Sequence, residues 1–153
     1  MKGHKPQETS VTYETKQGDC KAKSVLLKSI LDYIGVDSSI VLVNFHTDFY
    51  IKYYLPSLLT FNHVIVKINH KGEDHFVDAT LRDEFGYLEN RGFTYFMHYL
   101  EIKPNQKLYE RKSYKYPYYC VDEKVEFNAK EDTGHLKLIT VYRGNRANAR
   151  RRY

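Results

Sequence analysis

The sequence has few cysteines and no long hydrophobic run, and each absence excludes a class of protein. Its 153 residues include only two cysteines, Cys20 and Cys120, which do not make the disulfide framework of a small secreted domain. No apolar run approaches the length of a membrane-spanning helix, and Met1–Lys5 lacks the apolar region of a signal peptide. We therefore expect no membrane association and a cytoplasmic location for the chain as written.

Binding motifs for nucleic acids are also missing. The net charge of +5 is spread along the chain, with one cluster of arginines between positions 143 and 152. Fifteen tyrosines could stack on bases, but no nucleic-acid-binding motif accompanies them. A solvated basic helix is the more common explanation of such a tail, so nucleic acid is not an expected partner.

Metal-binding spacings are absent as well. His63, His70 and His75 lie near one predicted hairpin, but they match none of the familiar short zinc patterns. We expect neither a metal nor another cofactor.

The length fits one domain with an extension. A soft boundary near Lys103–Asn105 separates a predicted core, residues 1–103, from residues 104–153. The second part is predicted as a β-rich extension or the start of a following domain.

Four further predictions concern local structure. They are a central strand over 39–45, a loop or short helix over 48–59, one helical turn around 96–98, and a hairpin of 123–128 with 136–142 that turns at 131–134.

A well-marked amphipathic helix begins at Cys20. Asp19 is a favourable N-cap and Gly35 a favourable residue after the C-terminus, so the helix is predicted over about 20–34. Cys20 then lies in the first turn, where unpaired N–H groups and the helix dipole can lower the pKa of a thiol. Taken alone, a small buried cysteine is the more common explanation of such a residue. The predicted buried stripe comprises Leu27, Ile30, Leu31 and Ile34.

Two strands downstream carry a histidine and an aspartate. Residues 61–68 and 75–81 are predicted as strands of one hairpin. If the hairpin is centred on Lys71–Gly72, His63 and Asp78 become diagonal neighbours on the same face. A shift by one residue would place them on opposite faces. A surface histidine and a turn-flanking aspartate remain the alternative, which leaves the Cys–His–Asp order as a coincidence.

These stretches resemble the transglutaminase-like superfamily, a branch of the papain-like cysteine enzymes. The similar segments are Gly18–Lys23 with the helix that follows, Leu55–Ser57, Phe61–Val66 and Val77–Thr80. The resemblance covers about Pro6 to Thr80 and is closest to the core of bacterial multi-domain proteins with flanking β-rich domains. It implies an α+β fold with a papain/transglutaminase-like core, in which the helix of Cys20 packs on an antiparallel sheet.

The resemblance also implies roles for individual residues. Cys20 would be the nucleophile, His63 the general base and acid, and Asp78 the residue that orients His63. Residues assigned to the oxyanion site or to substrate binding are Gln17, Gly18 and Asn62.

The sequence departs from this superfamily at two places. Ala22 stands where relatives often carry an acidic residue, and only nineteen residues precede Cys20, where such cores normally have a helical segment. The chain would then be trimmed or naturally minimal at this end. The Cys20 backbone N–H would supply one oxyanion donor, and Gln17 or Tyr13 the second.

Two classes of function follow. The first is cysteine-dependent acyl transfer on amide bonds of a peptide or protein substrate, through a thioester. Water as the acceptor gives amidase or protease activity and a lysine amine gives crosslinking, and the sequence does not decide between them. The second is a catalytically inactive module that binds a peptide or another domain of a longer parent protein. If Cys20 is catalytic it is a free thiol, which leaves Cys120 as a buried or half-buried thiol.

Overall fold

The computed structural model describes residues 5–82, 84–88, 96–111, 121–128, 135–142 and 144–151. The chain forms two compact units. Unit 1 consists of Met1–Arg82 and Thr94–Ser113, and unit 2 of Asp83–Phe93 and Tyr114–Tyr153. Among the described residues, no helix has the length and apolar character that crossing a membrane requires.

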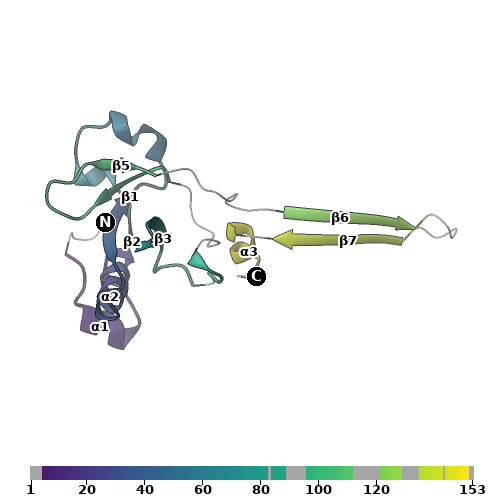
Figure 1. Ribbon diagram of the computed structural model, residues 1–153, viewed down its shortest axis with the longest axis horizontal. Helices are drawn as coiled ribbons and strands as arrows, with labels where there is room; N and C mark the ends of the chain where they lie inside the picture. Colours follow the sequence, from purple (N-terminus) through teal and green to yellow (C-terminus); the bar gives the residue numbers. More distant parts are fainter. Residues whose placement is uncertain are drawn as a thin grey trace. The chain divides into compact units, whose positions relative to one another are not determined.

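Unit 1 begins with two helices, α1 (Thr9–Thr15) and α2 (Cys20–Tyr33), which pack against each other (Figure 1). Gly18 allows this close packing. A Cβ atom at this position would lie 2.9 Å from Cβ of Ala22 and 3.2 Å from Cγ2 of Thr12. A larger residue at position 18 would therefore push the two helices apart.

The bounds of α2 agree with the prediction because local capping fixes them. At the N-terminus, the Asp19 carboxylate accepts a hydrogen bond from the Ala22 N–H at 3.0 Å. At the C-terminus, Gly35 adopts a φ of +75°, and the Val36 N–H donates to the Leu31 carbonyl at 2.8 Å. This is the Schellman arrangement that commonly ends helices.

The buried face of α2 differs from the predicted stripe. Its buried residues are Ala22 and Ser24, whereas Ile30 and Ile34 are 46% and 61% exposed. The stripe is wrong at its C-terminal end because the burial of α2 is concentrated in its first turns, beside the sheet.

Five antiparallel strands form the sheet of unit 1, in the order β3-β2-β1-β4-β5. The strands are β1 (Ser38–Val43), β2 (His63–His70), β3 (Glu73–Val77), β4 (His98–Glu101) and β5 (Leu108–Glu110). The central position predicted for the apolar strand is confirmed by β1. Helix α2 packs on β1 and β2, so the class is α+β with the cysteine-bearing helix against an antiparallel sheet.

The hairpin of β2 and β3 has the predicted register. Lys71 and Gly72 form its two-residue turn with φ values of 54° and 78°, as a type I′ turn requires. Val66 therefore pairs with Val77. The strand ends there, four residues before the predicted end at position 81, so Asp78 follows β3 directly.

The segment between β1 and β2 forms two short 3₁₀ helices, η1 (Asp48–Tyr53) and η2 (Leu58–Thr60), in agreement with the predicted loop or short helix. The Asp48 carboxylate is buried and accepts hydrogen bonds from the N–H groups of Met97 and His98, at 2.7 and 2.8 Å. The helical turn predicted at 96–98 is wrong, because His98 begins β4 and pairs with Glu110 of β5.

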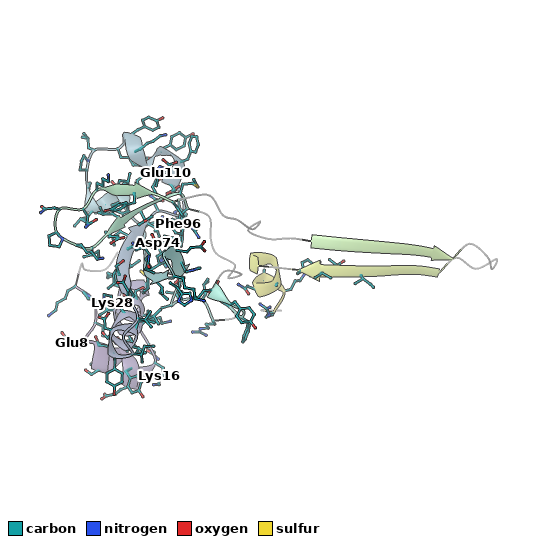
Figure 2. All side chains as sticks on the ribbon, in the orientation of Figure 1. Glu8, Lys16, Lys28, Asp74, Phe96 and Glu110 are labelled. Atoms are coloured by element: carbon teal, nitrogen blue, oxygen red, sulfur yellow. The ribbon has the colours of Figure 1, made fainter. Side chains whose placement is uncertain are left out.

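The core of unit 1 contains fully buried aliphatic residues of β1 and β2, including Val41, Val43 and Ile65. Phe96 is also fully buried, and its ring meets that of Phe76 edge-on at 5.0 Å between centroids. Figure 2 shows Phe96 among the side chains of this unit.

The boundary expected at 103–104 falls in the turn between β4 and β5. Because these strands pair in one sheet, unit 1 continues to Ser113.

Unit 2 contains the predicted second hairpin, made of β6 (Val121–Asn128) and β7 (His135–Tyr142). Helix α3 (Gly144–Arg151) follows and includes much of the basic tail. The guanidinium of Arg150 donates to the Tyr142 hydroxyl at 3.0 Å. The predicted turn at 131–134 and Cys120 lie outside the described residues.

Candidate active site

A buried hydrogen bond connects the elements that carry Cys20 and His63. Cys20 is half-buried in the first turn of α2, and His63 is the first residue of β2. Ser24, one turn after Cys20, is fully buried, and its hydroxyl donates to the carbonyl of Val64 at 3.0 Å. This bond fixes the start of the helix against the start of the strand.

His63 and Asp78 form a direct pair. The Nε2 atom of His63 lies 2.8 Å from Oδ2 of Asp78, whose side chain is almost completely buried. The other carboxylate oxygen accepts two hydrogen bonds from Thr80, one from its N–H at 2.8 Å and one from its hydroxyl at 2.6 Å. Asp78 is therefore held at both oxygens, and one of them faces the imidazole.

The electrostatics of the three side chains favour a thiolate beside an imidazolium. Hydrogen bonding to the His63 side chain lowers the pKa of the Cys20 thiol below its usual 9.0 and outweighs burial, which raises it. Burial also lowers the pKa of His63, but hydrogen bonds to Asp78 and Cys20 outweigh it and raise this pKa to about 9. Although burial raises the pKa of Asp78, hydrogen bonds from His63 and Thr80 hold it below 3.8.

The contacts of the ring also assign its two nitrogens. Because Nε2 of His63 is bonded to Asp78, Nδ1 is the nitrogen that can exchange a proton with a thiol. The ring of Phe45 lies 4.8 Å from the imidazole, between centroids. The imidazole is therefore held by a carboxylate at one edge and by an aromatic ring beside it.

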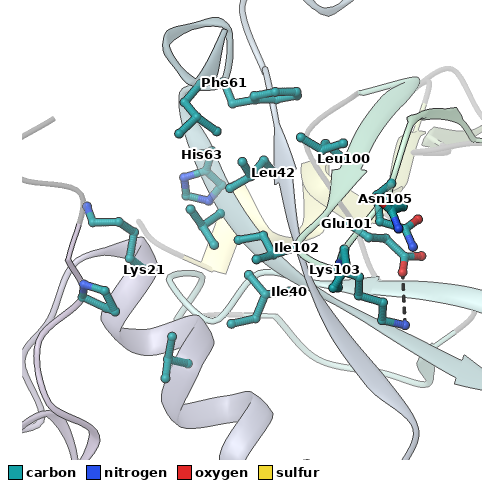
Figure 3. Close-up of a pocket in the computed structure, with 16 residues that line it drawn as sticks. Lys21, Ile40, Leu42, Phe61, His63, Leu100, Glu101, Ile102, Lys103 and Asn105 are labelled. Atoms are coloured by element: carbon teal, nitrogen blue, oxygen red, sulfur yellow. Dashed lines mark ion pairs between the residues drawn. The ribbon is translucent and has the colours of Figure 1, made fainter. Parts of the chain in front are cut away.

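A groove of about 730 Å³ opens beside His63 (Figure 3). Its apolar lining includes Ile40, Leu42 and Leu100, and Lys21 of α2 lies near its His63 end. A substrate that reached His63 would lie in contact with this apolar lining.

The three residues assigned to oxyanion or substrate binding have different surroundings. Gln17 is exposed between α1 and α2, and its backbone carbonyl accepts from the Gln7 side chain at 3.2 Å. Gly18 lies close to Ala22 and Thr12, where a Cβ atom would not fit.

Asn62 is used inside the protein. Its Oδ1 accepts from the Phe45 N–H at 3.1 Å, and its Nδ2 donates to Oδ1 of Asn44 at 3.2 Å. The amide of Asn62 therefore joins the end of β1 to the start of β2, and its expected role in substrate binding stays a prediction. Tyr13, the other donor considered, is exposed on α1, and the ammonium of Lys16 lies 3.8 Å from its ring centroid.

Sequence reasoning gave no role to Ser24, Thr80, Phe45 or Asn44. A signal was available for Ser24, which is a polar residue one turn from Cys20 on the face that packs on the sheet. Thr80 lies in one of the segments that resemble the superfamily, but its bonds to Asp78 depend on the turn after β3. In the part of the chain that the structure describes, no group of three or more His, Cys, Asp or Glu side chains could hold a metal ion.

No model of a protein family matches the chain, and no curated protein or solved structure is significantly similar to it. Any function for this chain therefore rests on the geometry of Cys20, His63 and Asp78.

Proposed function

We propose that this protein is a cysteine-dependent acyl-transfer enzyme that acts on amide bonds through a thioester. The observation that carries the proposal is the His63–Asp78 pair, at 2.8 Å, beside a helix-start thiol whose pKa is lowered by His63. A nucleophile, a base and a group that orients the base are the parts that such chemistry needs. We further propose that unit 1 is a papain/transglutaminase-like core.

The proposed reaction has two halves. The Cys20 thiolate attacks the carbonyl carbon of the amide, and the protonated His63 gives its proton to the departing amine as the carbon–nitrogen bond breaks. The neutral imidazole then takes a proton from water or from an acceptor amine, which attacks the thioester and releases the thiolate. Asp78 stabilises the imidazolium in each half and remains ionised.

The starts of α2 and β2 both contribute to the proposed chemistry. Besides the larger effect of His63, a hydrogen bond to the backbone of Val64 lowers the pKa of the Cys20 thiol, which supports the proposed thiolate. We propose the Cys20 N–H as one donor to the oxyanion, because the first N–H groups of a helix have no partner within the helix.

The apolar groove beside His63 also suits the alternative of an inactive binding module. Such a module would keep the groove beside His63 but would not need an activated thiol.

The rate of alkylation of Cys20 separates the two proposals. Iodoacetamide is added between pH 5 and 9, and the modified peptides are quantified by mass spectrometry, with Cys120 as the internal reference. The enzyme proposal expects Cys20 to react at pH 6 faster than Cys120 and to lose this advantage in His63→Ala. If Cys20 is alkylated only as the pH approaches about 8.5, as free thiols are, in both the unmodified protein and His63→Ala, Cys20 is not activated. The binding module is then supported.

A further inference from the structure

The groove beside His63 has a floor of apolar side chains from three adjacent strands. Leu42 of β1 pairs with Val64 of β2 on one side and with Leu100 of β4 on the other, so the three form a row across the sheet. Ile40 and Ile102 form the next row, and the Ile102 N–H donates to the Ile40 carbonyl at 3.0 Å. All five residues line the groove.

This face of the sheet is only partly covered, unlike the opposite face. Val41 and Val43, which point to the other side of β1, are completely buried. Leu42 lies between them and is only half-buried, and Ile102 is 58% exposed. An apolar surface left open on a central strand, next to a candidate catalytic pair, is typical of a binding site.

The two ends of the groove are polar. His63 and Lys21 lie at one side in Figure 3, and Lys103 and Asn105 of the β4–β5 turn lie at the other, where Lys103 pairs with Glu101 at 3.2 Å. An apolar floor between polar ends suits an extended peptide, because its side chains can be buried while its backbone amides reach polar groups. A hydrocarbon chain would make no use of the far end.

The adjoining surface also has the composition of a polypeptide-binding site. Leu58 of η2 lines the groove, and it belongs to a segment, residues 49–59, with several exposed apolar side chains. Three of these are the tyrosines Tyr50, Tyr53 and Tyr54, and tyrosine is enriched where proteins bind other proteins.

We infer that the groove selects extended peptide segments in which bulky apolar residues flank the amide presented to Cys20. The position of that amide rests on the proposed function, whereas the binding of the peptide does not need turnover. Each apolar side chain buried on the floor should improve binding by roughly 10-fold or more over a small polar one.

The test uses the full chain carrying Cys20→Ala, so that bound peptide is not consumed. Two fluorescein-labelled hexapeptides with a central glutamine are titrated by fluorescence anisotropy, one flanked by leucine and valine and the other by serine and aspartate. We expect the apolar peptide to bind at least about 10-fold more tightly. Equal binding of the two peptides would overturn the inference.

Matched substitutions place the binding in the groove. Ile102→Asp and Ile34→Asp change two isoleucines of similar exposure, 58% and 61%, of which only Ile102 lines the groove. We expect Ile102→Asp to weaken binding of the apolar peptide about 10-fold and Ile34→Asp to leave it unchanged. Leu58→Asp, with its neighbour Leu59→Asp as control, repeats the comparison at a second position, and circular dichroism verifies folding. Equal effects within both pairs would contradict the inference.

Binding to lipid vesicles and the reactivity of Cys20 are measured to distinguish the remaining outcomes. If Ile102→Asp reduces sedimentation with phosphatidylglycerol vesicles but leaves peptide binding unchanged, the groove serves a lipid surface and the inference is overturned. Selective peptide binding by a chain whose Cys20 is not activated would support the inference and refute the proposed enzyme. An activated Cys20 without peptide selectivity would refute the inference about the groove and leave the proposed enzyme unaffected.

Discussion

The hydroxyl of Ser24 donates a buried hydrogen bond of 3.0 Å to the carbonyl of Val64, which is the residue after His63. Ser24 itself lies one helical turn after Cys20. The bond therefore connects the two elements that carry the candidate nucleophile and base, and it does so without using either side chain.

Ser24→Ala should loosen this connection. The Val64 carbonyl would lose its buried partner, which should lower the free energy of unfolding by about 1–3 kcal/mol. Alkylation of Cys20 at pH 6 should also slow, because the thiol and His63 would no longer be held together. Ser29→Ala is the matched control, since the Ser29 hydroxyl is exposed and bonds only to the Val25 carbonyl of the same helix. Urea unfolding and alkylation rates measure both effects, and equal results for the two variants would contradict this role of Ser24.

Asp78→Asn should impair reactivity without unfolding the protein. Asparagine keeps the shape but removes the charge that stabilises the imidazolium, so the pKa of His63 should fall from about 9 towards 6.5. The pKa of the Cys20 thiol should rise in turn, and any amide turnover should fall by roughly 10²–10⁴-fold. The titration of His63 is followed by NMR, with the exposed Asp74→Asn as control. An unchanged pKa of His63 in Asp78→Asn would contradict the stabilisation of the imidazolium by Asp78.

Thr80 should act as a positioning residue through Asp78. Thr80→Val removes the hydroxyl donor at 2.6 Å and keeps the N–H donor at 2.8 Å. The carboxylate would be held less firmly, so its hydrogen bond to His63 should weaken and the pKa of His63 should fall. The pH profile of Cys20 alkylation should then move to higher pH. Thr80→Ser restores the hydroxyl and should restore the profile. If valine changes stability but leaves the pH profile unchanged, Thr80 is only structural.

Stability should depend on pH through His63. Because its pKa is raised from 6.5 to about 9 on folding, the protonated ring contributes stability that is complete below pH 6.5 and is lost as pH rises through 9. The lowered pKa of Cys20 acts in the opposite direction, since its contribution grows as pH rises towards 9.

The His63 contribution is therefore measured in Cys20→Ala, where Asp78 alone raises the pKa of the imidazole and the upper end of the window moves below 9. Urea unfolding between pH 5.5 and 9 should show stability falling above pH 6.5. The additional change His63→Ala should abolish this fall. A fall of the same size in the double variant would assign it to other groups.

Features that depend on neighbours in the chain could be predicted from the sequence. The bounds of α2 follow from the Asp19 cap and the left-handed Gly35, and the register of the β2–β3 hairpin follows from the Lys71–Gly72 turn. Because the turn sets which residues of the two strands face each other, His63 and Asp78 could be predicted on one face of the hairpin. Together with Cys20 at the start of its helix, they could be proposed as a site.

Features that depend on residues far apart in the chain were decided by the tertiary structure. The carboxylate of Asp48 and the pairing with β5 make His98 extended, where local sequence favoured a helical turn. Asn62 bonds to Asn44 and Phe45, which the end of β1 places beside it, so its amide connects two strands of the sheet. The physical reason is the same in both cases: a buried polar group takes the partner that folding provides, and the linear sequence does not show which partner that is.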